Sequence, residues 1–133
     1  MSVRSPADDF SVTSAQLGGE THVVSVTGEL DVATSPALRE ALLAANTRPG
    51  SEVVVNLLSV PFIDSSALGV LVDMSKRLRA RGGTLAVVCE DRQLVKIFEI
   101  TGLTRILAVY PTLRDALEAL GAEGSLAAPS PVR

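Results

Sequence analysis

Aromatic residues, cysteine and histidine are scarce in this chain. Its 133 residues include three Phe, one Tyr, no Trp, one Cys and one His. So few rings leave little surface for stacking nucleic-acid bases, and a formal net charge of -3 repels polyanions. A single Cys cannot close an internal disulfide, and one Cys with one His cannot form a zinc-binding set. We therefore expect no nucleic-acid partner, no metal site and no cofactor.

Long apolar runs and a secretory signal are also missing. No segment approaches the roughly 20 apolar residues that cross a bilayer, and the start at Met1–Arg4 lacks the apolar core of a signal peptide. These absences predict a cytoplasmic protein from a reducing compartment, with no membrane partner. Cys89, which closes the apolar run Leu85–Val88, is then expected to be a small core residue rather than a reactive thiol.

Aliphatic residues dominate the rest of the sequence. Hydrophobic residues make up 47% of the chain, enough for one core built from Val, Leu, Ile and Ala. We expect one domain over residues 10–121. The segments 1–9 and 122–133 carry no periodicity and are polar or rich in small residues and proline, so we expect both to be disordered.

Strand and helix patterns alternate along this domain. Apolar residues in Phe10–Leu17 and His22–Thr27, separated by Gly18–Gly19, predict an opening hairpin that places His22 in an edge strand. The next patterns predict a helix capped by Thr34 or Ser35, an inner strand at Val53–Leu58 and a helix from Asp64 or Ser65 to Arg81. After these, the sequence predicts a strand at Thr84–Cys89, a helix ending near Gly102, a strand at Arg105–Val109 and a helix capped by Thr112. This order predicts an α/β fold: a mainly parallel mixed sheet, an N-terminal antiparallel hairpin and about four helices.

The turn after the inner strand carries the most informative chemistry. Asp64 or Ser65 can cap the next helix, which places the hydroxyls of Ser65 and Ser66 in its first turn. Free backbone N–H groups and the positive end of the helix dipole lie there, so the fold would tolerate a phosphate on Ser65. Taken alone, Asp64 and Ser65 are better explained as plain helix caps than as a regulatory site, because Asp and Ser are common at helix starts.

This turn resembles the phosphorylation loop of the bacterial anti-sigma-factor antagonists, small proteins of the STAS-domain family. The family motif reads Asp-Ser-Ser-Gly-Leu-Gly; here it is matched by Asp64, Ser65, Ser66, Leu68 and Gly69, with Ala67 at the place of the first Gly. Three further segments resemble the family's early loop, a later turn, and its third helix with the exit from it: Gly28–Asp31, Gly82–Leu85, and the spacing of Leu94, Phe98, Gly102–Leu103 and Ile106.

The resemblance implies a STAS fold and a non-enzymatic role. In the family, the unmodified antagonist binds an anti-sigma factor that is also a serine kinase, and this frees a sigma factor for transcription. Phosphorylation of the first motif Ser, here Ser65, ends the interaction, and a PP2C-type serine phosphatase reverses it. By position, the resemblance implies partner contacts at Asp31, Asp64, Ser65, Ser66 and Leu68. Asp31 is equally explained as a turn before the next helix, and we expect a monomer or a weak homodimer.

Other classes of function fit the sequence less well. A serine hydrolase lacks the Gly-x-Ser-x-Gly elbow and has only His22 as a base. An aspartyl-phosphate receiver would use Asp64, but Glu90 and Asp91 form an incomplete magnesium site. A STAS module that serves as a scaffold or senses a ligand, outside a sigma-factor circuit, remains as an alternative.

Overall fold

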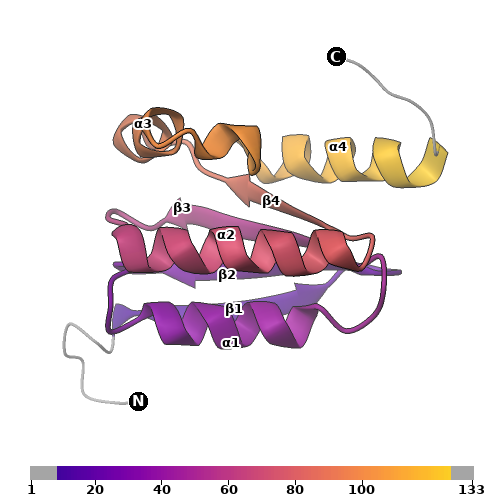
Figure 1. Cartoon of the computed structure of the whole chain (residues 1–133), viewed down its shortest axis with the longest axis horizontal. Helices are drawn as coiled ribbons and strands as arrows, with labels where there is room; N and C mark the ends of the chain where they lie inside the picture. The colour runs from indigo at the N-terminus through magenta and orange to yellow at the C-terminus, as the bar shows by residue number, and fades with distance from the viewer. Residues whose placement is uncertain (1–8, 127–133) are drawn as a thin grey trace.

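The computed structural model describes residues 9–126 and contains a five-stranded sheet in the order β1-β2-β3-β4-β5 (Figure 1). β1 and β2 are antiparallel, and every later pair is parallel. The strands are β1 (Ser11–Gln16), β2 (Thr21–Thr27), β3 (Glu52–Ser59), β4 (Thr84–Val88) and β5 (Ala108–Tyr110). The predicted hairpin and the mainly parallel mixed sheet are both confirmed.

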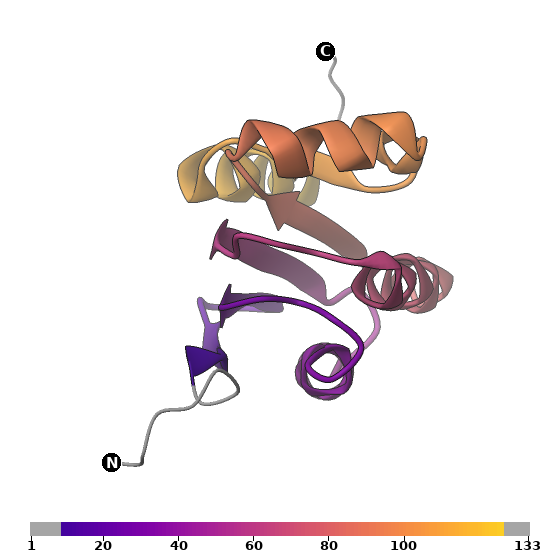
Figure 2. The ribbon, with the colours of Figure 1, turned by 90° about the vertical axis from the view of Figure 1, so that its left-hand side faces the viewer.

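Within residues 9–126, four α-helices cover the sheet, as expected. They are α1 (Ser35–Ala45), α2 (Ser65–Ala80), α3 (Arg92–Ile100) and α4 (Leu113–Leu126), and a short 3-10 helix, η2 (Leu103–Arg105), follows α3. Buried side chains of α1, α2 and α3 share one cluster, whereas those of α4 join a second cluster on the other face of the sheet. Figure 2 shows α1 and α2 side by side on one face, with α4 across the sheet from them. Among the described residues, no helix is long and apolar enough to cross a membrane.

The central strand explains why both faces need helices. Val53, Val54 and Val55 are all completely buried. Because successive side chains of a strand point to opposite faces, Val53 and Val55 pack with α1 and α2, and Val54 packs with α4. The uninterrupted apolar run is therefore that of an inner strand, as predicted.

Two expectations about the strands are wrong, namely the residue at which β5 begins and the place of His22 in an edge strand. Residues 103–107 form a helical turn, in which the N–H groups of Ile106 and Leu107 both donate to Leu103 O, so β5 begins at Ala108 rather than at residue 105. β2 lies between β1 and β3, so His22 is not in an edge strand. The helix α4 continues to Leu126, beyond the expected domain end at residue 121. The rest of both predicted tails, 1–8 and 127–133, lies outside the described residues.

Candidate functional site

Two loops are joined side by side at the edge of the sheet where the parallel strands end. Gly28 N–H donates to Ser59 O at 3.1 Å, Leu30 N–H donates to Phe62 O at 2.9 Å, and Asp64 N–H donates to Leu30 O at 3.0 Å. These bonds form an isolated parallel bridge, Leu30 to Ile63, beyond the ends of β2 and β3. The loop before α1 and the loop before α2 thus form one connected surface, which faces the viewer in Figure 2.

Buried apolar side chains anchor this connection. Leu30 is fully buried, and Val60 and Ile63 are each 3% exposed. Gly28 has a φ of 102°, and a Cβ at this position would lie 3.0 Å from the Cα of Phe10. A larger residue at Gly28 would therefore be strained by its backbone and by this contact.

Asp64 is the cap of α2. Its backbone is extended, and its Oδ1 accepts hydrogen bonds from Ser66 N–H at 2.8 Å and from Ala67 N–H at 3.2 Å. Ser65 is the first helical residue and is exposed, whereas Ser66 is half-buried. The capping prediction is confirmed. The expectation of free N–H groups beside Ser65 needs correction, because Asp64 already binds two of them.

Asp31 organises the neighbouring loop. Its Oδ1 accepts from Ala33 N–H at 3.0 Å, from Thr34 N–H at 3.1 Å and from the Thr34 hydroxyl at 3.1 Å. The Asp31 N–H in turn donates to Thr34 Oγ1 at 2.9 Å. These bonds confirm that Asp31 turns the chain into α1, and its contact with a partner remains a prediction.

Exposed apolar side chains lie beside these polar groups. Val32 follows Asp31 and is 72% exposed, and Phe62 precedes the buried Ile63 and is 48% exposed. We define the Ser65 surface as Asp31, Val32, Phe62, Ser65, Ser66 and Leu68, the last of which is half-buried. Val32 and Phe62 were not predicted as site residues. The sequence signal that could have identified Phe62 is its position directly after Pro61, because a large apolar residue in a turn need not belong to the core.

The two positions at which the family motif has glycine differ in their surroundings. Ala67 is completely buried, so its methyl group packs into the core and the helix is regular there. Gly69 is exposed and has no positive φ, and a Cβ added to it would meet no atom within 4 Å. Neither the backbone conformation nor the packing therefore requires a glycine at position 69. The fold of the chain does not explain why glycine occurs at this exposed position.

Residues that could support enzymatic chemistry lie elsewhere. His22 is near the start of β2, at the opposite end of the strand from the Asp31 loop, and its buried Nε2 has no hydrogen-bond partner within the described residues. Asp91 caps α3 by accepting from the N–H groups of Gln93 at 2.8 Å and Leu94 at 3.3 Å. Within residues 9–126, no group of three His, Cys, Asp or Glu side chains is placed to hold a metal ion.

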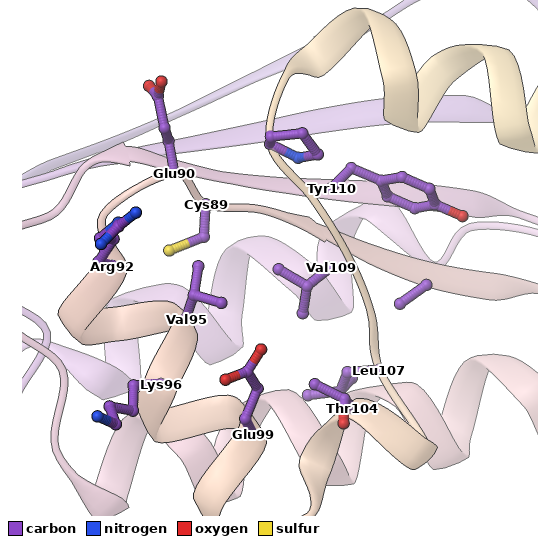
Figure 3. A pocket seen from close by; sticks show the side chains of 12 residues that line it. Cys89, Glu90, Arg92, Val95, Lys96, Glu99, Thr104, Leu107, Val109 and Tyr110 are labelled. Atoms are coloured by element: carbon purple, nitrogen blue, oxygen red, sulfur yellow. The ribbon is translucent and has the colours of Figure 1, made fainter.

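A groove of about 710 Å³ separates α3 from β5 and η2 (Figure 3). Cys89 and Val95 line it, with Lys96 and Glu99 on the α3 side. Cys89 is only 2% exposed, and burial raises the pKa of its thiol, so the thiolate is disfavoured at neutral pH. Cys89 is thus a core residue, as predicted.

Comparisons with known proteins agree with this architecture. The family model described as STAS domain matches residues 14–116. The anti-sigma-B factor antagonist of Bacillus subtilis is 35% identical over 86 residues, which are 65% of this chain and 78% of the relative. The crystal structure of an anti-sigma factor antagonist from Mycobacterium paratuberculosis has a TM-score of 0.74 and 33% identity, covering 84% of this chain and 93% of that one.

A more distant structure shares the fold. The anti-sigma factor antagonist SpoIIAA in its unphosphorylated form has a TM-score of 0.71 at 21% identity, covering 84% of this chain and 97% of that one. With the bridged loops and the Asp64 cap at the place of the family motif, these matches confirm the resemblance found in the sequence. The chain belongs to the STAS domain family, and within this family it is similar to anti-sigma factor antagonists.

Proposed function

We propose that this protein is an anti-sigma factor antagonist whose unphosphorylated form binds an anti-sigma factor through the Ser65 surface and so frees a sigma factor for transcription. The bound partner acts as a serine kinase on Ser65, and a PP2C-type phosphatase restores the binding form, all in the cytoplasm. The main support is the position of Ser65, which is exposed at the first turn of α2, with the apolar residues Phe62, exposed, and Leu68, half-buried, before and after it in the sequence.

The charge of a phosphate explains how one hydroxyl can control binding. Phosphorylation adds about 1.5 to 2 negative charges at neutral pH. On free protein, the phosphate at Ser65 faces solvent beside the Asp64 carboxylate, where its cost is small. In a complex it is desolvated without a cationic partner, and an unpaired buried charge costs several kcal/mol, or on the order of a hundredfold in affinity.

The apolar part of the surface provides binding energy in the unmodified state. Phe62 and Val32 expose large apolar side chains next to the acidic Asp31. Aromatic side chains that become buried at the centre of an interface are common binding hot spots. A partner with an apolar pocket, and without a basic group opposite Ser65, would bind the hydroxyl form and reject the phosphate.

The test compares Ser65 with its neighbour. Wild type, Ser65→Ala, Ser65→Glu and the matched control Ser66→Ala are used to capture partners from lysate of the source organism, and each captured kinase is then incubated with each variant and ATP. Wild type and Ser66→Ala should be phosphorylated, Ser65→Ala should bind without being phosphorylated, and Ser65→Glu should bind weakly. Equal labelling of Ser65→Ala and wild type would overturn the site, and equal retention by all four would overturn the proposed switch.

A further inference from the structure

The strand β1 forms an edge of the sheet that lacks the usual protection against pairing. It has six residues, Ser11–Gln16, and its register with β2 is continuous, without a bulge. From Phe10 to Gly19 there is no charged residue and no proline. Natural edge strands are normally blocked by charge, proline, bulges or short length. The other edge, β5, has three residues and is followed by Pro111, so it is short and ends at a residue without an N–H.

The hydrogen bonds of the hairpin show which backbone groups of β1 face outward. Leu17 N–H donates to Thr21 O at 2.8 Å, and Thr21 N–H donates to Gly18 O at 3.2 Å, so at the hairpin end the Leu17 N–H points toward β2. Hydrogen-bonded and non-bonded pairs alternate along an antiparallel ladder. The N–H and C=O groups of Val12, Ser14 and Gln16 therefore point away from β2, and they have no partner within residues 9–126.

We propose that this edge pairs with the β1 edge of a second copy of the chain, so that the two sheets join around a two-fold axis at Ser14. An antiparallel pairing of identical strands places Ser14 opposite the partner's Ser14, and Val12 opposite the partner's Gln16. All outward backbone groups of β1 are then used, in about six N–H···O bonds. Because the edge carries no charge, its two copies meet without like-charge repulsion.

The helix beside this edge is also suited to a second copy. Arg39 points from α1 to α2, where its Nη1 binds Asp73 Oδ2 at 2.6 Å. By helical spacing, the flank of α1 opposite Arg39 carries Ala37, Ala41 and Ala44. In Figure 2, α2 lies on one side of α1 and the β1 edge lies toward the other. Methyl side chains on this flank let two copies of α1 approach each other above the joined strands.

The proposed dimer is independent of the proposed function. Its contacts are at the β1 edge and on the flank of α1 that carries Ala37, Ala41 and Ala44. The Ser65 surface instead lies in the loops before α1 and α2 and in the first turn of α2, at the ends of the parallel strands. Pairing two short strands buries little surface, so we expect a weak dimer that forms with rising concentration. Both Ser65 surfaces remain open in it.

The first test measures mass against concentration. Sedimentation equilibrium of the full chain from about 10 μM to about 1 mM should show a reversible monomer–dimer equilibrium. Ser14→Pro should weaken it by about thirtyfold, because each copy loses one intermolecular hydrogen bond at the axis. Proline is tolerated where the N–H of an edge strand faces outward, and thermal melting checks that the fold is kept. The matched control Ser14→Ala retains the N–H and should dimerise like wild type.

The second test reads the register. Ser14→Cys should form a disulfide-linked dimer under mild oxidation, because opposed residues of a hydrogen-bonded pair have Cα atoms about 5.5 Å apart. Ser11→Cys is the matched control on the same strand; its two copies would lie about 20 Å apart along the paired strands. A wild type that stays monomeric at the highest concentration, or equal cross-linking of the two cysteine variants, would overturn the proposal. Neither result would bear on the proposed role of Ser65 in partner binding.

Discussion

Gly69 offers a way to separate folding from partner binding. It lies inside α2, has no positive φ, and has no atom within 4 Å of the position of a Cβ. A glycine inside a helix costs about 0.5 to 1 kcal/mol relative to alanine, chiefly because the unfolded chain is more flexible. Gly69→Ala should therefore raise the free energy of unfolding by about that amount, and the melting temperature by roughly 2 to 6 °C.

The same substitution should weaken partner binding. Gly69 is one helical turn after Ser65, and both residues are exposed on the same side of α2. If the partner covers Ser65, a new methyl group at position 69 enters a packed interface, where overpacking costs about 1 to 3 kcal/mol, or roughly tenfold or more in affinity. Calorimetric melting and titration with the captured partner measure the two effects.

Gly121→Ala is the matched control for this experiment. Gly121 lies in α4, is exposed, and likewise has no atom near the position of a Cβ. It should stabilise the protein similarly and leave the partner affinity unchanged. A lower melting temperature for Gly69→Ala would contradict the regular helix at this position. Equal affinities of the two variants would show that the partner does not cover this turn of α2.

Three further substitutions test other parts of the structure. Asp64→Ala should lower the free energy of unfolding in chemical denaturation by about 1 kcal/mol, because two N–H groups lose their acceptor. Asp64→Asn should change it by only a few tenths of a kcal/mol, since Asn also caps helices. Equal losses in the two variants would contradict the capping role. Phe62→Ala should change stability little but reduce partner affinity at least fivefold, while Leu43→Ala, at a similarly exposed position of α1, should leave affinity unchanged. Hydrogen bonds from Arg39 and Arg77 lower the pKa of Asp73 in the folded protein. The ionised Asp73 therefore contributes its full stabilising effect above pH 3.8, and this effect is lost as the pH falls through the lower folded pKa. The stability difference between wild type and Asp73→Asn should shrink as the pH falls below 3.8, and a constant difference would contradict the ion pairs.

The elements that sequence predicts well are those specified by local signals. The run Val53–Leu58 is apolar at every position but one, which requires cover on both faces, and Asp64 is a strong cap directly before helical spacing. These two signals alone place Ser65 at the start of α2. The role that we propose for this serine rests on the family motif, because no local pattern contains it.

The elements that sequence predicts poorly depend on contacts between distant segments. An apolar run such as Ile106–Val109 suits a strand, but its first residue closes the turn of η2 and only residues from 108 onward pair with β4. The bridge between Leu30 and Ile63 joins residues far apart in the chain, so no local pattern shows that their loops form one surface. The exposure of Phe62 follows from that bridge, which turns its neighbour Ile63 into the core.

The capping role of Asp64 bears on how a phosphate at Ser65 would act. A phosphate at a helix start often gains backbone N–H partners and reorders the segment. Here the N–H groups of Ser66 and Ala67 are already bound to Asp64, so a phosphate can take them only by displacing a carboxylate that holds the helix start. Phosphorylation should therefore change the charge of the surface more than the fold of the chain. The change in affinity must then arise in the complex, from the groups that the partner places opposite Ser65, and amide chemical shifts of the free protein should change only near α2's first turn.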